Sequence, residues 1–148
     1  MVLGIIGVGT MGEALIKGIQ ASSEYKQIKI IGSTRSENSA AMVREKYRIE
    51  CVTSNRAVAR AADVLILAVK PRQAEMVLRE LKPYLRKGQL LISICAALPI
   101  ASLQKWTGKK CGILRAMPNT PAIVGEGITV LCAEEDLPES AVRQAERI

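Results

Sequence analysis

Residues 2–15 read VLGIIGVGTMGEAL, and this stretch decides the fold. Its first part, 2–6, is an apolar run with the length of a buried strand, and 10–22 has the apolar spacing of a helix. Glycines interrupt the junction at positions 7, 9 and 12. Because glycine costs conformational entropy when a chain folds, their concentration here indicates a need for bare backbone.

Gly7, Gly9 and Gly12 have the spacing G-x-G-x-x-G between a predicted strand and a predicted helix, the context in which this motif binds a dinucleotide. There the first glycine permits a tight turn, the second lets a pyrophosphate approach, and the third lets the helix pack on the strand. The helix N-terminus then offers free N–H groups to the phosphates. A glycine-rich turn without a ligand is the alternative. For Gly4, in the strand, and Gly18, on the helix, we expect close packing.

Strand and helix patterns alternate along the rest of the chain. Further strands are predicted at 28–31, near Cys51, and at 63–69, 89–94, 111–117 and 127–133. Further helices are predicted from Ser36 and Ser54, over 72–81, and from about Pro138. The residues expected to face inward on the helices are Met11, Leu15, Ile19, Ala40, Val43, Tyr47, Ala74, Val77, Leu78 and Leu81. This alternation predicts a Rossmann-type α/β fold, with a doubly wound, mostly parallel sheet and helices on both faces.

The composition excludes several classes of protein. The 148 residues, 49% of them hydrophobic, are enough for one domain with a core. No apolar run reaches the roughly 18 residues that span a bilayer. Since the start also lacks the basic region of a signal peptide, we expect a cytoplasmic protein with no membrane partner. The net charge is +7, but basic residues are interleaved with acidic ones and aromatic residues are few, so we expect no nucleic-acid partner.

The four cysteines form no CxxC pair, and the sequence has no histidine. Zinc sites and Ser-His or Cys-His pairs are therefore excluded, and we expect no bound metal. Three of the four cysteines lie in apolar, strand-like runs, so we interpret them as reduced core residues. Cys95 has no neighbouring base in the sequence, and we do not assign it as a nucleophile.

The end of the second predicted strand indicates the choice of cofactor. An NAD-binding unit usually carries an acidic residue here for the ribose 2′-hydroxyl, but this chain has Ser33, Thr34 and Arg35. Two hydroxyls and a guanidinium suit a 2′-phosphate, so we expect a preference for NADP(H), with NAD(H) as the alternative. The other interpretation of Arg35 is a surface residue in a turn.

Three further strand ends carry candidate binding residues. AVKPRQ (68–73) places Lys70 within reach of a phosphate or ribose, and SICAAL (93–98) supplies small side chains that let a ring approach. In RAMPNTPAIVGEG (115–127), two prolines bracket Asn119 and Thr120. We interpret this rigid loop as a wall of the substrate pocket beside the nicotinamide. For each segment, solvent exposure or simple packing is the alternative.

Together these residues resemble the pyrroline-5-carboxylate reductase family. The matching segments, in the family's order, are GIIGVGTMGEALIKG (4–18), STR (33–35), DVLILAVKP (63–71), SICAAL (93–98) and RAMPNTPAIVGEG (115–127). The resemblance implies NADPH-dependent hydride transfer to the C=N bond of 1-pyrroline-5-carboxylate, a cyclic imino acid, which gives proline. It also implies that residues 1–137 are an NADP-binding domain. Residues 138–148 would then start a helix leading into a helical C-terminal domain that dimerises and holds the catalytic residue.

By motif matching, the resemblance implies cofactor contacts at Gly7, Val8, Gly9, Thr10, Met11, Gly12, Ser33, Thr34, Arg35, Asn55, Ala68, Val69, Lys70, Pro71, Cys95, Ala96 and Ala97. It places five residues near the nicotinamide and substrate: Met117, Pro118, Asn119, Thr120 and Pro121. Two other functions stay open. One is another NADP-dependent reductase of imines or carbonyls, and the other is a regulatory NADP-binding paralogue without catalysis.

Overall fold

The computed structural model describes residues 1–22, 28–119, 121 and 125–148. Its strands are β1 (Val2–Ile6), β2 (Lys29–Ser33), β3 (Glu50–Val52), β4 (Val64–Leu67), β5 (Leu90–Ser93), β6 (Gly112–Pro118) and β7 (Thr129–Ala133). Its helices are α1 (Thr10–Ala21), α2 (Glu37–Tyr47), α3 (Asn55–Ala61), α4 (Pro71–Leu81), α5 (Ile100–Thr107) and α6 (Glu139–Arg147), with a short 3-10 helix, η2 (Lys82–Tyr84). Within these described residues, no helix is both long and apolar enough to cross a membrane.

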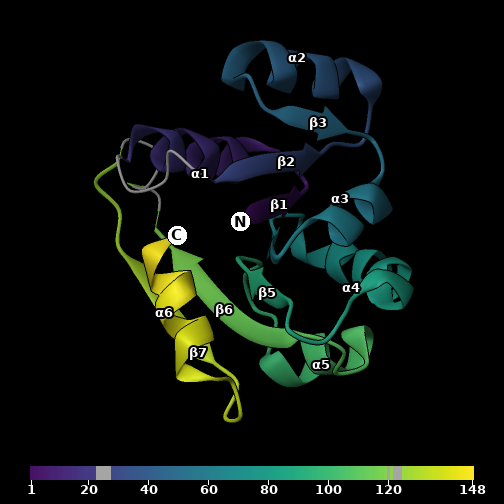
Figure 1. Ribbon diagram of the computed structural model, residues 1–148, viewed down its shortest axis with the longest axis vertical. Coiled ribbons are helices and arrows are strands. Elements are labelled where there is room, and N and C mark those ends of the chain that lie inside the picture. The colour runs from purple at the N-terminus through teal and green to yellow at the C-terminus, as the bar shows by residue number, and fades with distance from the viewer. Residues whose placement is uncertain (23–27, 120, 122–124) are drawn as a thin grey trace.

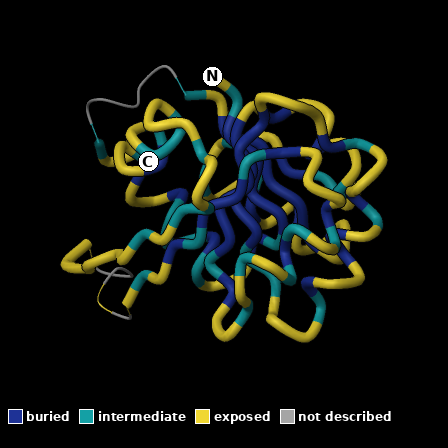
Figure 2. The backbone as a smooth tube through the Cα atoms, turned by 90° about the horizontal axis from the view of Figure 1, so that it is seen from below, coloured by how far each residue is buried: buried dark blue, intermediate teal, exposed yellow. Residues whose placement is uncertain are grey.

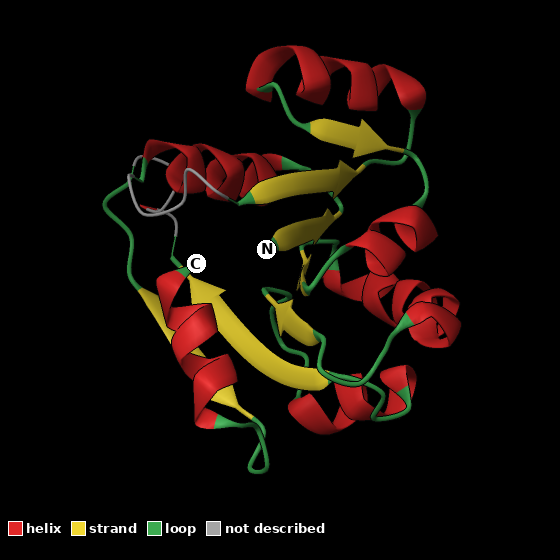
Figure 3. Ribbon diagram, viewed as in Figure 1, coloured by secondary structure: helices red, strands yellow, loops and turns green. Residues whose placement is uncertain are grey.

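The strands form one sheet in the order β3-β2-β1-β4-β5-β6-β7 (Figures 1 and 3). β1 to β6 are parallel, and β7 runs antiparallel to β6. The first six strands have the order of doubly wound dinucleotide-binding sheets, with β1 in the centre. The predicted fold class is therefore confirmed.

Helices cover both faces of the sheet, and alternate strand residues enter one of two cores. Figure 2 shows the buried strands enclosed by more exposed helices and loops. Along β4, Leu65 and Leu67 face the core under α3, α4 and α5, whereas Val64 and Ile66 face the core under α1, α2 and α6. Because both faces are covered, every residue of β4 and of β5 is buried.

The predicted helix starts are confirmed at two serines. The Ser36 hydroxyl accepts the backbone N–H of Ser39, and the Ser54 hydroxyl accepts that of Ala57. Each bond satisfies an N–H group that has no partner inside its helix. These caps fix the points where the chain leaves β2 and β3, at the edge that carries the glycine turn.

Two helix predictions need correction or addition. On α1 the buried residues are Gly12, Ile16 and Ile19, whereas Met11 and Leu15 are only half-buried. The inward stripe is shifted because Gly12, which has no side chain, is the residue that meets β1.

Helix α5 was not predicted; its eight residues are held by burial of Leu103 and Thr107 against the sheet. For so short a helix, tertiary packing decides the structure more than the local pattern does.

The expectation of close packing is confirmed for Gly4 and wrong for Gly18. A Cβ atom on Gly4 would lie 2.8 Å from side-chain atoms of Val58, Ala62 and Leu65. A Cβ atom on Gly18 would meet nothing within 4 Å among the described residues. Gly4 therefore lets α3 approach β1, whereas Gly18 faces open space.

This contrast gives a stability prediction. Gly4→Ala should lower the free energy of unfolding by about 1–3 kcal/mol, because the added methyl overpacks the core. Gly18→Ala should instead raise it by about 0.5–1 kcal/mol, because alanine is the better helix former. Urea denaturation of both variants measures the two changes. An unchanged midpoint for Gly4→Ala would contradict the close contact between Gly4 and α3.

Candidate dinucleotide-binding site

The predicted site residues lie in loops at one edge of the sheet. Because β1 to β6 are parallel, the loops that follow β1, β2, β4, β5 and β6 all leave from their carboxyl ends. In doubly wound sheets, ligands bind outside this edge, where the chain winds in opposite directions from the central strands. β1 lies between β2 and β4, so the glycine turn is at that point.

The glycine turn has the geometry that the motif predicts. Gly7 has a φ of +88°, which glycine adopts without strain. A Cβ atom on Gly12 would lie 3.2 Å from the Gly7 carbonyl oxygen, so Gly12 lets α1 pack close to the turn. A Cβ atom on Gly9 would meet nothing within 4 Å among the described residues. Gly9 thus borders open space at the start of α1.

That open space lies next to free hydrogen-bond donors. Within the described part of the chain, the backbone N–H groups of Thr10, Met11 and Gly12 have no protein acceptor. They are the first N–H groups of α1, whose N-terminus carries a partial positive charge. Donors and dipole together suit a phosphate group.

A charged cluster keeps the start of α1 attractive to anions. Glu13 is in the first turn of α1, and its Oε2 accepts bonds from Lys46 Nζ and the Tyr47 hydroxyl, both at 2.7 Å. These bonds, the one from Lys46 first, lower the pKa of the Glu13 carboxyl. The carboxylate is thus balanced by a cation from α2. Sequence reasoning missed this pairing, although an acidic residue beside the motif was the available signal.

Ser33 and Asn55 support the glycine turn from behind. The Ser33 carbonyl accepts the N–H groups of Gly7 and Val8 at 3.1 and 2.8 Å. The Ser33 hydroxyl donates to Asn55 Oδ1 at 2.7 Å and accepts from Gly7 N at 3.3 Å. Ser33 is fully buried. Its hydroxyl is therefore committed to the turn, and Asn55 connects the turn to α3.

Ser33→Ala should therefore destabilise the fold by about 1–3 kcal/mol, because it removes a buried hydroxyl that bonds both to Gly7 N and to the part-buried Asn55 Oδ1. Ser140→Ala, at an exposed position on α6, is the matched control and should change stability by less than about 0.5 kcal/mol. Thermal and urea unfolding measure both variants. Equal stability of the two would mean that the Ser33 hydroxyl does not support the turn.

Gly32 is a second supporting residue that sequence reasoning missed. A Cβ atom there would lie 2.7 Å from Val8 Cγ2. Gly32 therefore leaves the space into which Val8 of the turn packs. The signal was a glycine inside an apolar strand, which often marks a close approach.

Thr34 and Arg35 differ in their availability. Thr34 is buried, and its hydroxyl donates to the Ser36 carbonyl at 3.0 Å. Arg35 is exposed, and among the described residues it has no ion-pair or hydrogen-bond partner. Of the three predicted residues at the end of β2, Arg35 is thus the one with free donors.

The loops after β4 and β5 lie on the other side of the glycine turn. Ala68 and Val69 are half-buried, Lys70 is the exposed N-cap of α4, and Pro71 is its first residue. In the next loop Cys95 is buried, whereas Ala96 and Ala97 are exposed. Ala97 has a φ of +58°, a conformation that costs energy for a residue with a side chain. This strained residue lies at the carboxyl edge of the sheet.

The loop between β6 and β7 is closed at its base by Asn119. Its N–H donates to the Ile128 carbonyl at 3.2 Å, and its Oδ1 accepts the Ile128 N–H at 2.9 Å. Met117 and Pro121 are exposed, and Pro118 is half-buried. Thr120 lies outside the described residues. The Asn119 side chain thus holds the hairpin together.

The cysteines match their predicted role as free core residues in three cases. Cys51, Cys95 and Cys111 are buried, and Cys132 is exposed; none forms a disulfide. Burial raises the pKa of the Cys51 and Cys95 thiols and raises that of Cys111 to about 12. These three thiols are therefore protonated at neutral pH and are poor nucleophiles.

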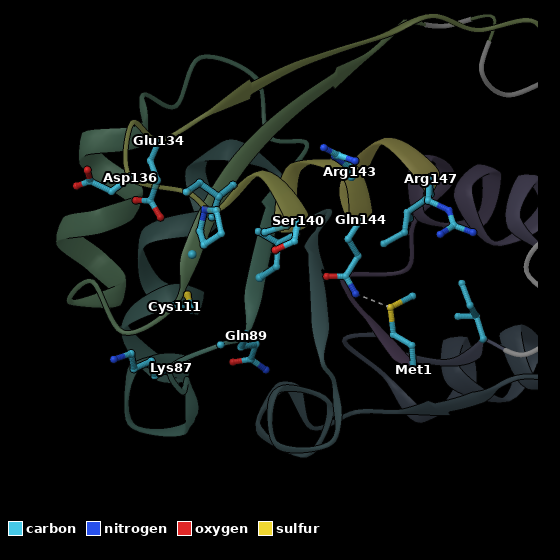
Figure 4. A pocket seen from close by; sticks show the side chains of 18 residues that line it. Met1, Lys87, Gln89, Cys111, Glu134, Asp136, Ser140, Arg143, Gln144 and Arg147 are labelled. Carbon is cyan, nitrogen blue, oxygen red and sulfur yellow. Dashed lines mark hydrogen bonds between the residues drawn. The ribbon is translucent and has the colours of Figure 1, made fainter.

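Two cavities lie apart from the glycine turn. One of about 1000 Å³ lies at the amino ends of the strands, beside α6, where Met1, Gln89, Cys111, Gln144 and Arg147 line it (Figure 4). One of about 460 Å³ lies between α1, α6 and the sheet, and its lining is mainly apolar. Neither is lined by a glycine of the motif. The carboxyl edge therefore stays the candidate site, despite the larger hollow at the opposite edge.

Residues 2–97 match the family model described as NADP oxidoreductase coenzyme F420-dependent. The chain belongs to this family. The match extends from β1 through the glycine turn to the loop after β5, and so includes the ends of β1, β2, β4 and β5 but not the loop after β6.

Pyrroline-5-carboxylate reductases from several organisms are similar to this chain. That of Pseudomonas aeruginosa is 34% identical over 143 residues, which are 97% of this chain and 52% of the relative. The structure from Coxiella burnetii has a TM-score of 0.91 and 36% identity, over 98% of this chain and 54% of the other. The structure from Plasmodium falciparum, with NADP bound, has a TM-score of 0.84 and 33% identity, over 99% of this chain and 53% of the other. This chain thus spans about half the length of these relatives.

Proposed function

We propose that this chain binds NADPH along the carboxyl edge of its sheet, as the NADP-binding part of an enzyme that reduces 1-pyrroline-5-carboxylate to proline. The observation that carries the proposal is the open space at Gly9 beside the free N–H groups of Thr10, Met11 and Gly12. The similarity of this chain to reductases named for pyrroline-5-carboxylate supports the choice of reaction.

The residues at the edge fit each part of the cofactor. The pyrophosphate would lie over Gly9, where the N–H groups of α1 can donate to its oxygens. The exposed Arg35 would bind the 2′-phosphate, which NADH lacks. The loops at 68–71 and 95–97 would receive the nicotinamide half, beyond β4 and β5. When bound, NADPH supplies the hydride that the reaction needs.

The work of the chain itself is orientation and exclusion of water. The Met117–Pro121 loop would cover the reacting face, and the loops after β4 and β5 would fix the ring. A protonated imine is already electrophilic, so a strong side-chain acid is not required. We propose that the catalytic residue and the surface for homo-oligomer formation belong to a further domain, with residues 138–148 leading to it. We also propose that the protein is cytoplasmic.

Calorimetric titration of these 148 residues with NADPH and with NADH tests cofactor binding and preference. We expect binding of NADPH that is tighter than that of NADH. The protein that contains this chain should then oxidise NADPH in the presence of pyrroline-5-carboxylate. Activity with other imines or carbonyls alone would favour a different reductase of this fold. NADPH binding without any reduction would favour a regulatory paralogue.

A further inference from the structure

Cys95 connects the loop after β5 to the loop after β4. Its Sγ lies 3.2 Å from the Val69 carbonyl oxygen and 3.6 Å from that of Leu67. Its own N–H donates to the Ser93 hydroxyl at 3.3 Å. Only 2% of Cys95 is exposed. The thiol, which burial keeps protonated, is thus a donor to the backbone of the neighbouring loop.

Val69 is held from its other side by the glycine turn. A Cβ atom on Gly7 would lie 2.7 Å from Val69 Cγ1 and 3.2 Å from Val69 N, so the bare Gly7 backbone packs on this residue. Val69 therefore lies between the turn after β1 and Cys95. Through these contacts, the loops after β1, β4 and β5 form one connected unit.

The position of this unit relates it to one half of the cofactor. In doubly wound sheets the adenosine ribose lies at the end of β2, and the pyrophosphate lies at the glycine turn of β1. The sheet order places β4 and β5 on the opposite side of β1 from β2. The loops that Cys95 connects thus face the nicotinamide half and not the adenosine half.

We propose that Cys95 is a positioning residue that fixes the Val69 backbone and thereby shapes the nicotinamide end of the site; this rests on the proposed function. The other explanation for a buried cysteine is filling of the core. Cys111 is the matched comparison, because it is also buried but lies just before β6, at the opposite edge. Its truncation should affect stability without affecting the cofactor.

Two ligands separate the two halves of the site. NADPH occupies both halves, whereas adenosine 2′,5′-bisphosphate has no nicotinamide. By calorimetry, Cys95→Ala should weaken NADPH about fivefold, because the Val69 backbone loses the bond that holds it in position, and leave the bisphosphate unchanged within about twofold. Cys95→Ser keeps a donor and should bind both ligands like the unchanged chain.

Cys111→Ala should lower the melting temperature and leave both affinities unchanged. If Cys95→Ala does not fold, Cys95→Val removes the donor while filling the space, with the same expectation.

The proposal is overturned if Cys95→Ala binds NADPH normally or weakens both ligands equally. It is also overturned if Cys95→Ser is as weak as Cys95→Ala, because the donor would then be irrelevant. Failure of the unchanged chain to bind NADPH would instead overturn the proposed function, and the role of Cys95 with it. If the unchanged chain binds NADPH normally, a negative result with the Cys95 variants therefore counts against the role of Cys95 and not against the proposed function.

Discussion

Gly9→Val should abolish NADPH binding, with a loss of more than about 100-fold in affinity, and leave the fold intact. The backbone of Gly9 has a φ of −113°, which valine adopts without strain. Its side chain would enter space that is open in the structure, so no protein atom has to move. The same space is where the pyrophosphate must lie. Calorimetric titration and thermal unfolding measure the two effects.

Gly18→Val is the matched control, because it adds the same side chain to an open position within α1, the helix that Gly9 caps. This variant should bind NADPH like the unchanged chain. Normal affinity in Gly9→Val would exclude the glycine turn as the phosphate site. A large loss of stability in Gly9→Val would mean that Gly9 serves packing.

Arg35→Ala should weaken NADPH by about 10- to 100-fold and change NADH by less than about twofold. The expected loss corresponds to about 1.5–3 kcal/mol for hydrogen bonds that involve a charged group. It is specific to NADPH, because the 2′-phosphate is the only group by which the two reduced cofactors differ. Titration of the variant with each cofactor gives the ratio directly.

Lys105→Ala removes the same charge from an exposed position on α5. It controls for general attraction between a basic chain and an anion, and both affinities should stay within about twofold of those of the unchanged chain. Equal losses for NADPH and NADH in Arg35→Ala would refute the assignment. So would a similar loss of NADPH affinity in Lys105→Ala.

Most of the fold could be predicted because each central strand is an apolar run between turn signals. β4 and β5 are buried on both faces, so their sequence is apolar except for Ser93 at the end of β5. α5 escaped prediction because it is only eight residues long, although Ile100, Leu103 and Trp106 recur at helical spacing and pack against the same core. On α1, Ile19 is buried as predicted, but the buried stripe begins at Gly12 and runs through Ile16, and glycine carries no hydrophobic signal that would show this.

For the candidate site, the sequence indicates which segments meet but not how each side chain is used. Ser33 and Thr34 are residue types that bind phosphate, yet in the structure both hydroxyls bond to the protein. The side chain of a residue at the end of a strand can face either the ligand or the protein. For Ser33, the hydrogen bond to Asn55 turns the hydroxyl toward the protein, and Asn55 is 22 positions away in the chain. The bond from Cys95 to Val69 likewise joins loops 26 residues apart.

During synthesis the strands of this sheet are made in an order that starts inside the sheet and ends at its edge. β1 emerges first, β2 and β3 add to one side, and β4 then returns to the free side of β1. From β5 onward each new strand pairs with the one made just before it, so its partner is already in place. Until the next strand arrives, the newest one is an open edge to which another chain can add. A nascent chain that has reached β4 or β5 therefore presents at that edge a strand that is fully buried in the folded chain, whereas β7 is antiparallel and largely exposed.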